Sequence, residues 1–307
     1  MPIVIPKGIP ACTVLQNENV FVMRAVRAYA QDIRPIEICI LNLMPTKVET
    51  ETQLMRLLGN SPLQIKATLL ATESYQSKNT SKKHLDQFYT SFSEIKASKK
   101  NFDGMIITGA PVETMNFEDV EYWGELQDIM KYAKKHVTST MYICWGSQAG
   151  LYFHHGIEKK MLDKKLSGVY RHEKTTVYEP LLKGVDEIFN IPHSRYTGVD
   201  EEAVYASCNL EVIARSPESG IGIVKSIDNK SFFMSGHMEY DKETLKNEYI
   251  RDLTKGVDTA PPANYFLDDD MNIIMNWSAT ANLIMSNWLN YYVYQVTPYE
   301  LDEIDDM

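Results

Sequence analysis

Cysteine is scarce in this chain of 307 residues, which has only Cys12, Cys39, Cys144 and Cys208. None of them forms a CxxC pair and no spacing resembles a zinc site, so the sequence predicts no metal centre. Four thiols over this length are also too few for a disulfide scaffold. The cysteines therefore indicate a reducing compartment, and we expect a cytoplasmic protein in which most of these thiols are simply buried.

Long apolar runs and excess positive charge are also absent. No stretch reaches the roughly 18 continuous apolar residues of a membrane span. Residues 1–10 are interrupted by Pro2, Pro6, Gly8 and Pro10, which leaves no apolar core for a signal peptide. The 41 acidic residues outnumber the 31 lysines and arginines and give a net charge of -10. The chain therefore has no excess of basic residues to neutralise the phosphates of a nucleic acid. We expect neither a membrane nor a nucleic acid as partner.

The first half of the chain alternates short apolar runs with helical patterns. The runs are short enough for buried strands, and apolar residues between them recur at helical spacing. The predicted strands are 36–43, 63–70, 104–108 and 138–144, and the predicted helices are 46–58, 118–136 and 146–154. Strands separated by helices predict an α/β fold with a mostly parallel sheet that helices cover on both faces.

The pattern changes after about residue 168, where shorter strands are predicted at 210–214, 221–227 and 231–234. Helices are expected at 241–255, with Asp241 as N-cap, and at 278–294. The polar stretches 77–83 and 258–272 are predicted to be loops, the first a possible lid. We find no repeat or linker and predict one domain over 1–307, composed of an N-terminal arm (about 1–35), an α/β core (about 36–256) and a C-terminal helical extension (about 257–307).

Cys144 is the candidate nucleophile. It ends a predicted strand and is followed at once by a helical pattern, which is the arrangement of a nucleophile elbow. Gly146 provides the small residue that such a crowded turn needs. A cysteine there faces the positive end of the next helix, which favours the thiolate, and backbone N–H groups at that helix start can stabilise an oxyanion. The alternative is a buried structural cysteine, which is our interpretation of the other three.

His237 is the candidate base, because a thiol nucleophile needs one. It follows the predicted strand 231–234, and Glu239, two residues on, can orient its ring. An H-x-E pattern alone is equally compatible with a surface pair at a strand end. His154 and His155 lie on the helix after Cys144, and we expect them to point away from the site.

A cysteine elbow followed by H-x-E resembles the class I glutamine amidotransferases and their flavodoxin-like, doubly wound fold. Six ordered motifs are more specific, and together they resemble the homoserine O-acyltransferases of the MetA type. The motifs are LNLMPTK (41–47), TGAPVE (108–113), YICWG (142–146), LSGV (166–169), PHSRY (192–196) and GHMEY (236–240). The chain keeps the glycine and glutamine of the amidotransferase elbow as Gly146 and Gln148 but departs from it at Ser147 between them.

The resemblance implies a ping-pong transfer in methionine biosynthesis. Cys144 would take an acyl group from acyl-CoA, and His237, oriented by Glu239, would act as base on the homoserine hydroxyl. The resemblance assigns substrate contacts to Lys165, Ser194 and Arg251. We expect Lys47, which follows a predicted strand, to neutralise either the oxyanion or the CoA phosphates, and Trp145 to support the oxyanion. A guanidinium suits the homoserine carboxylate. Without the resemblance, solvated surface charges would explain the lysines and Arg251 equally well.

Glu113 indicates which acyl group is carried. Succinyl-transferring members resemble one another in having glycine at this position, whereas a glutamate fills the space and opposes the succinyl carboxylate. Two like charges about 4 Å apart at an effective dielectric near 20 repel by about 4 kcal/mol. We therefore predict acetyl-CoA as the co-substrate, with succinyl-CoA as the alternative and with no cofactor. A turn-capping surface role for Glu113 is the alternative to this interpretation.

Two other functions remain possible from the sequence. One is a glutaminase-type amidotransferase, although no synthase domain is visible. The other is a regulatory module without chemistry, although Cys144, His237 and Glu239 are all retained. The predicted partners are L-homoserine and acetyl-CoA, and the resemblance further implies a homodimer.

Overall fold

The computed structural model describes residues 3–306 except 7, 19, 21, 24–26, 29–32, 76 and 78. Within these residues, twelve strands form one sheet in the order β2-β1-β4-β3-β6-β7-β12-β11-β10-β8-β9, with β5 paired to β4 outside this path. The strands are β1 (Ile3–Val4), β2 (Val22–Met23), β3 (Ile36–Leu41), β4 (Ile65–Ala71), β5 (Tyr89–Ser91), β6 (Phe102–Ile107), β7 (Val137–Ile143), β8 (Lys159–Lys174), β9 (Ile188–Val199), β10 (Leu210–Ser216), β11 (Gly220–Ser226) and β12 (Ser231–Met234).

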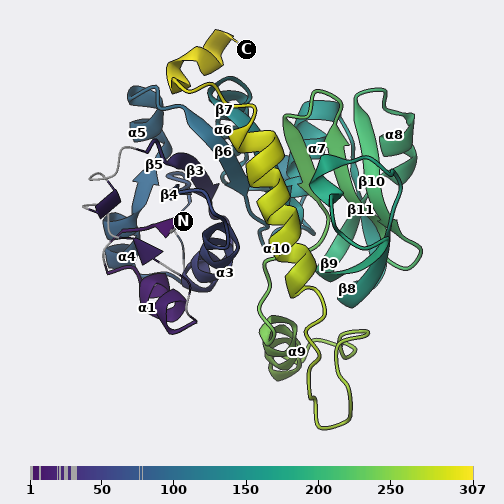
Figure 1. Cartoon of the computed structure of the whole chain (residues 1–307). Coiled ribbons are helices and arrows are strands. Elements are labelled where there is room, and N and C mark those ends of the chain that lie inside the picture. The colour runs from purple at the N-terminus through teal and green to yellow at the C-terminus, as the bar shows by residue number, and fades with distance from the viewer. Residues whose placement is uncertain are drawn as a thin grey trace.

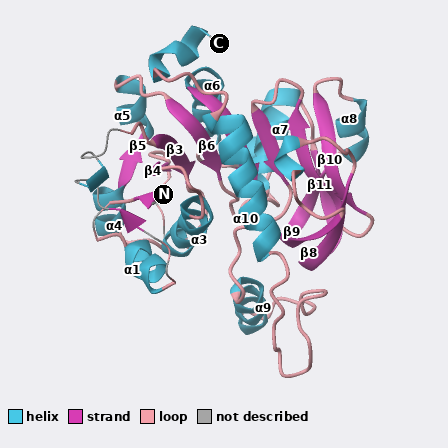
Figure 2. Ribbon diagram, viewed as in Figure 1, coloured by secondary structure: helices cyan, strands magenta, loops and turns pink. Residues whose placement is uncertain are grey.

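Helices lie on both sides of this sheet (Figures 1 and 2). The α-helices are α1 (Pro10–Asn17), α3 (Lys47–Gly59), α4 (Lys82–Phe88), α5 (Phe92–Ala97), α6 (Trp123–His136), α7 (Trp145–His155), α8 (Glu201–Ala206), α9 (Thr244–Thr254) and α10 (Ser278–Asn287). The other helical segments are the 3₁₀ turns η1 (Phe117–Asp119), η2 (Pro180–Leu182) and η4 (Leu301–Asp306) and the π-helix η3 (Trp288–Tyr294). No helix in the described part of the chain is both long and apolar enough to cross a membrane.

The parallel half of the sheet confirms the sequence prediction. Strands β4, β3, β6, β7 and β12 lie side by side in this order and are all parallel. Counted by their appearance in the chain, they follow the order 2-1-3-4-5 of flavodoxin-like sheets. In such sheets the carboxyl ends of the strands form the usual ligand-binding edge. Cys144 follows β7 directly and therefore lies at that edge.

Alternating side chains of the parallel strands separate two apolar clusters. On β3, Ile38 and Ile40 belong to one cluster, whereas Cys39 and Leu41 belong to the other. The first cluster receives side chains from α3, α10 and η3, and the second from α5, α6 and α7. Figure 1 shows α10 crossing one face of the sheet with α6 and α7 behind it. The two buried faces explain why these strands are nearly continuous apolar runs.

The long antiparallel hairpin of β8 and β9 was not predicted. Most of β8 before Gly168 is exposed or half-buried and rich in lysine, so it lacks the alternation that identifies a strand. The hairpin pairs Ser167 with Ser194 and Leu166 with Arg195. This pairing brings the LSGV and PHSRY motifs together, and it carries both to the edge where Cys144 lies.

Several predicted boundaries shift in the structure. Helix α6 begins at Trp123, because the preceding residues form the separate turn η1. Asp241 is not an N-cap: α9 begins at Thr244, and the Asp241 carboxylate instead pairs with Arg56. The predicted loop 77–83 ends in α4, which is capped by the Ser81 hydroxyl. Lys78 of this loop, and Met1 and Pro2 of the N-terminal arm, lie outside the described residues.

Candidate active site

The turn between β7 and α7 holds Cys144 at the cavity wall under backbone strain. Cys144 is the N-cap of α7 and has φ 52° and ψ -117°, a conformation that non-glycine residues rarely adopt. A Cβ atom on Gly146 would lie 2.6 Å from the carbonyl oxygen of Thr108 and 2.8 Å from that of Ile107. Only glycine fits there without displacing the neighbouring backbone. The strand-to-helix corner is thus a nucleophile elbow, as predicted.

His237 and Cys144 are brought together although 93 residues separate them in sequence. The imidazole is hydrogen-bonded to the Cys144 side chain, and its Nδ1 lies 2.7 Å from Oε1 of Glu239. Gly109 leaves room for both groups, since an added Cβ would lie 3.2 Å from Cβ of Cys144 and 3.3 Å from Cε1 of His237. The cysteine, imidazole and carboxylate therefore form a chain of contacts of the kind that activates a thiol.

The charges of Cys144 and Glu239 favour the protonated form of the His237 imidazole. Burial alone would lower the pKa of His237, whose residue is 2% exposed. The negative charges of Cys144 and Glu239, and the hydrogen bonds to both, outweigh burial and raise the pKa of His237 well above its ordinary value. The Tyr240 ring stacks on the imidazole at a centroid distance of 4.1 Å. The imidazolium form of His237 is thus favoured, and its ring is held by Glu239 on one side and by Tyr240 on the other.

A cavity of about 200 Å³ opens above Cys144 and contains most of the side chains predicted from the sequence. Its lining includes residues from the elbow, the β8–β9 hairpin, α9 and the loops after β3 and β6, among them Glu113, Cys144, Lys165, Ser194, His237 and Arg251. Glu239 lies behind His237. As expected, His154 and His155 lie at the far end of α7, where His154 contacts the hydroxyl of Tyr142.

Lys165 and Arg251 meet at one carboxylate. Lys165 Nζ lies 2.7 Å from Oδ2 of Asp252, and Arg251 donates to Oδ1 from Nε at 2.9 Å and from Nη2 at 2.8 Å. Burial raises the pKa of Asp252, but the hydrogen bonds from both cations outweigh it and hold that pKa below its ordinary value. Two cations share the Asp252 carboxylate here, so each keeps hydrogen-bond donors that can bind a further carboxylate.

The carboxylate of Glu113 is fixed by the backbone of β9. Its Oε2 accepts hydrogen bonds from the N–H groups of Tyr196 at 2.7 Å and Thr197 at 3.1 Å, and lies 3.0 Å from the Thr197 hydroxyl. The Lys159 ammonium donates to the Glu113 carbonyl oxygen at 2.7 Å. Glu113 therefore ties the loop after β6 to β9 instead of capping its own turn, and its charge has a defined position in the cavity wall.

Lys47 and Trp145 do not line this cavity with their side chains. The Lys47 ammonium donates to the carbonyl oxygen of Asn42, and burial lowers the pKa of Lys47 to about 8 against the opposing charge of Glu51. The Trp145 ring is fully buried against Phe117. What Trp145 can offer an oxyanion is its main-chain N–H, because the first N–H groups of a helix have no partner within it.

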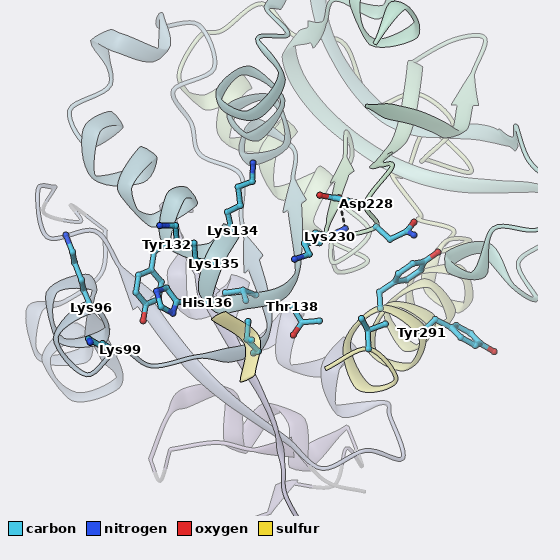
Figure 3. A pocket seen from close by; sticks show the side chains of 15 residues that line it. Lys96, Lys99, Tyr132, Lys134, Lys135, His136, Thr138, Asp228, Lys230 and Tyr291 are labelled. Carbon is cyan, nitrogen blue, oxygen red and sulfur yellow. Dashed lines mark hydrogen bonds between the residues drawn. The ribbon is translucent and has the colours of Figure 1, made fainter. Parts of the chain in front are cut away.

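A larger cavity of about 1190 Å³ lies at the opposite, amino-terminal ends of β7 and β12 (Figure 3). Five lysines and His136 line it, and the His136 ring stacks on Tyr132 at 4.0 Å. Lys134, Lys135 and His136 form the last turn of α6, where the helix dipole favours positive side chains. This cavity contains neither a cysteine nor a carboxylate–histidine pair, so it is not the chemical site.

Comparison with known proteins identifies the family. A sequence model of the family described as homoserine O-succinyltransferase matches residues 2–299. A curated homoserine O-acetyltransferase of Methanomethylophilus alvi is 56% identical over 306 residues, covering 99% of this chain and 98% of its own length. Homoserine O-acetyltransferase 1 of Ilyobacter polytropus is 54% identical and covers 98% of this chain and 100% of its own length.

The chain belongs to the homoserine O-succinyltransferase family.

Solved structures place this family member in the predicted fold class. A glutamine amidotransferase of Thermotoga maritima aligns with a TM-score of 0.56 at 10% sequence identity, covering 85% of this chain and 100% of its own. A glutamine amidotransferase from Methylobacillus flagellatus gives a TM-score of 0.54 at 12% identity, covering 88% and 98%. The fold is therefore confirmed as class I glutamine amidotransferase-like, and at these identities the likeness concerns the fold alone.

Glu248 is a cavity residue of this family member that sequence reasoning missed. It lies on α9, three residues before Arg251, and lines the cavity. Its Oε1 accepts a hydrogen bond of 3.0 Å from the Tyr240 hydroxyl, whereas the buried Oε2 has no partner among the described residues. The i, i+3 spacing to Arg251 is the signal that could have identified it, because such residues share a helix face.

Proposed function

We propose that this chain is a homoserine O-acetyltransferase that works through an acetyl group carried on Cys144. The observation that supports it most is the Cys144–His237–Glu239 contact chain at the floor of a cavity that contains Glu113 and two cationic side chains. Relatives more than 50% identical along the full length bear the homoserine O-acetyltransferase name, which favours acetyl over succinyl transfer.

In the first half-reaction, the Cys144 thiolate attacks the carbonyl carbon of acetyl-CoA. The tetrahedral intermediate collapses with cleavage of the bond to the CoA sulfur, and the imidazolium of His237 protonates the departing thiolate. The products are acetyl-Cys144, free CoA and a neutral imidazole. N–H groups at the start of α7 are available to the oxyanion. Because the thioester is already activated, this step needs no cofactor.

In the second half-reaction, the homoserine hydroxyl attacks the acetyl carbonyl. Acylation has removed the thiolate charge that held the proton on His237, so the ring now has a lower proton affinity and can accept the hydroxyl proton. The bond to the Cys144 sulfur breaks, which gives O-acetylhomoserine and restores the thiolate–imidazolium pair. Glu239 keeps the Nδ1 side of the ring occupied and thus directs the reactive nitrogen toward the cavity.

The cavity wall offers a partner for each polar group of homoserine. We assign the substrate carboxylate to Arg251 and Lys165, with Ser194 as a further polar contact on β9. We assign the ammonium to the unpartnered oxygen of Glu248, because a buried carboxylate oxygen without a hydrogen-bond partner is costly unless a ligand supplies one. Glu113 limits the acyl group to acetyl by filling the space and by opposing a second carboxylate.

A donor panel tests this function. Acetyl-CoA and succinyl-CoA are each supplied with homoserine to the native enzyme and to Cys144→Ala, and O-acyl product is quantified. We expect acetyl transfer by the native enzyme, no transfer by Cys144→Ala, and an acetyl adduct on the Cys144 peptide after mixing with acetyl-CoA alone. Preference for succinyl-CoA would overturn the donor assignment. Glutamine hydrolysis without acyl transfer would favour the amidotransferase, and the absence of any adduct would favour a regulatory module.

The family resemblance also supports a homodimer located in the cytoplasm as part of this proposal. Light scattering coupled to size-exclusion chromatography measures the assembly directly. A mass corresponding to a single chain at working concentration would contradict the dimer without affecting the chemistry.

A further inference from the structure

Arg195 carries a buried positive charge without an acidic partner. The residue is 4% exposed, and its three hydrogen bonds end on neutral acceptors. Nε donates to Nδ1 of His193 at 3.3 Å, Nη1 to the carbonyl oxygen of Thr197 at 2.6 Å, and Nη2 to the carbonyl oxygen of Ser219 at 2.6 Å. No carboxylate lies within ion-pair distance among the described residues. Buried charges are normally paired, so this one requires an explanation.

The imidazoles next to Arg195 do not change this charge. Burial, together with the charge of Arg195, holds the pKa of His193 well below its ordinary value, and burial lowers the pKa of His172 to about 4. The two rings stack at a centroid distance of 5.2 Å with an interplanar angle of 10°. Both are therefore neutral at physiological pH, and the guanidinium keeps its full positive charge because arginine does not lose its proton in proteins.

Arg195 shares neighbours with the elements that carry Cys144 and His237. Gln148, one helical turn after Cys144, donates to the same Thr197 carbonyl oxygen that accepts from Arg195, at 3.2 Å. On the other side, Cε1 of His193 lies 3.0 Å from the position of a Cβ on Gly236, the residue before His237. Arg195 is thus linked to the first turn of α7 through the Thr197 carbonyl oxygen, and to the backbone before His237 through His193.

The charges that act on Arg195 also link it to Cys144. Burial lowers the pKa of Arg195, and the negative charge of Cys144 is the strongest opposing influence, followed by Glu113 and Glu201. The negative charge of Cys144 also acts on His237 and Tyr240, both on the loop after β12. Among these groups, only Arg195 is positive at every stage of the reaction.

We infer that Arg195 is a positioning residue whose permanent positive charge stabilises the Cys144 thiolate independently of His237. The inference rests on the proposed acyl-enzyme mechanism. His237 loses its positive charge when it protonates the departing CoA and regains it only as the homoserine hydroxyl attacks. A permanent cation is present throughout, and it therefore favours Cys144 both as the attacking thiolate and as the leaving thiolate.

Thiol ionisation in a His237→Asn background tests the inference, because that substitution removes the titrating partner. The rate at which iodoacetamide alkylates the Cys144 peptide is followed by mass spectrometry as a function of pH. We expect the midpoint in His237→Asn to lie below about 8.5, the ordinary value for a cysteine. Adding Arg195→Met should raise it by about one pH unit and slow alkylation near neutral pH about tenfold. Adding Arg215→Met instead, at an exposed position on β10, should leave the midpoint unchanged.

Folding is monitored in parallel by circular dichroism and thermal denaturation. If Arg195→Met lowers the melting temperature but not the alkylation midpoint, Arg195 only ties β9 to the turn before β11, and the inference is wrong. If Arg195→Met does not fold, Arg195→Lys and Arg195→Gln are compared instead. If the positive charge acts on the thiol, the alkylation midpoint is lower in the lysine variant than in the glutamine variant. Equal midpoints in the two variants would overturn the inference. Alkylation uses neither acetyl-CoA nor homoserine, so these outcomes are independent of the substrate assignment.

Discussion

At the scale of single residues, we expect Glu113 to determine which acyl donor can be used. One of its oxygens is held by two backbone N–H groups and faces a hydroxyl of β9, so the carboxylate cannot easily swing away from an incoming succinyl group. We expect Glu113→Gly to raise kcat/KM with succinyl-CoA by at least about tenfold relative to acetyl-CoA, because both the bulk and the like charge disappear. Steady-state kinetics with both donors measures this ratio.

The matched control for this change is Glu121→Gly, since Glu121 is exposed and lies outside the cavity. It should leave the donor ratio as in the native enzyme. If Glu113→Gly also keeps the native ratio, the donor assignment is wrong.

Glu248 gives a second prediction at this scale. Glu248→Gln keeps an oxygen for the Tyr240 hydroxyl but removes the negative charge that we assign to the homoserine ammonium. Hydrogen bonds to charged groups contribute about 1.5–3 kcal/mol, so KM for homoserine should rise roughly tenfold to a hundredfold. KM for acetyl-CoA should change little in the same assay, and Glu243→Gln at the exposed start of α9 should change neither. An unchanged homoserine KM would remove Glu248 from the substrate site.

The residues that sequence could identify share a local signal. Cys144 and His237 each follow a strand, and Glu239 is two residues beyond His237, so their roles follow from position and residue type. Glu248 has only its i, i+3 spacing to Arg251, and Arg195 has no such signal. The first depends on how α9 is oriented over the cavity, and the second on burial of a strand that the sequence did not reveal.

At the scale of secondary-structure elements, β8 is joined to the C-terminal segment through Gly168. The Val169 N–H donates to the Ala263 carbonyl oxygen at 2.8 Å, and the Ala263 N–H donates to that of Ser167 at 2.9 Å. Gly168 has φ 148°, and an added Cβ would lie 2.4 Å from the Ala263 oxygen. We expect Gly168→Ala to lower the free energy of unfolding by at least about 1–3 kcal/mol, because backbone on one side must move.

Chemical denaturation measures this loss, and Gly124→Ala is its control. Gly124 lies in the first turn of α6 with no atom within 4 Å of an added Cβ, so alanine there should be neutral or stabilising by up to about 1 kcal/mol. Equal stability of the two variants would mean that the Gly168–Ala263 junction does not constrain the fold.

Elements differ in how well their sequences predict them. The parallel strands are buried on both faces and form apolar runs in the sequence, so all five were located to within a few residues. The β8–β9 hairpin was missed because its stability comes from pairing between segments that are partly exposed and individually polar. The start of α9 was misjudged because Asp241, which has the properties of an N-cap, is held by Arg56 instead.

At the scale of the whole molecule, the C-terminal helices are part of the central core. Trp288 is fully buried in the same cluster as β3 and α3, and its indole N–H donates to the Ser139 hydroxyl on β7 at 2.9 Å. Trp288→Ala should cost about 3–5 kcal/mol of stability, since it leaves a large cavity. Unfolding followed by circular dichroism and by tryptophan fluorescence should give coincident transitions at lower denaturant concentration.

Tyr294→Ala, at a position 52% exposed one turn later, provides the comparison and should be close to native in stability. Two separate transitions for Trp288→Ala would contradict a shared core and would indicate that the C-terminal helices unfold by themselves.

The left-handed main chain at Cys144 has a consequence for how this enzyme can evolve. A cysteine in that conformation costs on the order of 1–3 kcal/mol, a sizeable share of the roughly 5–15 kcal/mol by which proteins of this kind stay folded. Glycine would relax the corner and abolish the chemistry, so selection for activity keeps the strained cysteine. Fewer destabilising substitutions are therefore tolerated elsewhere in the protein, because the strain at Cys144 has already lowered the free energy of unfolding.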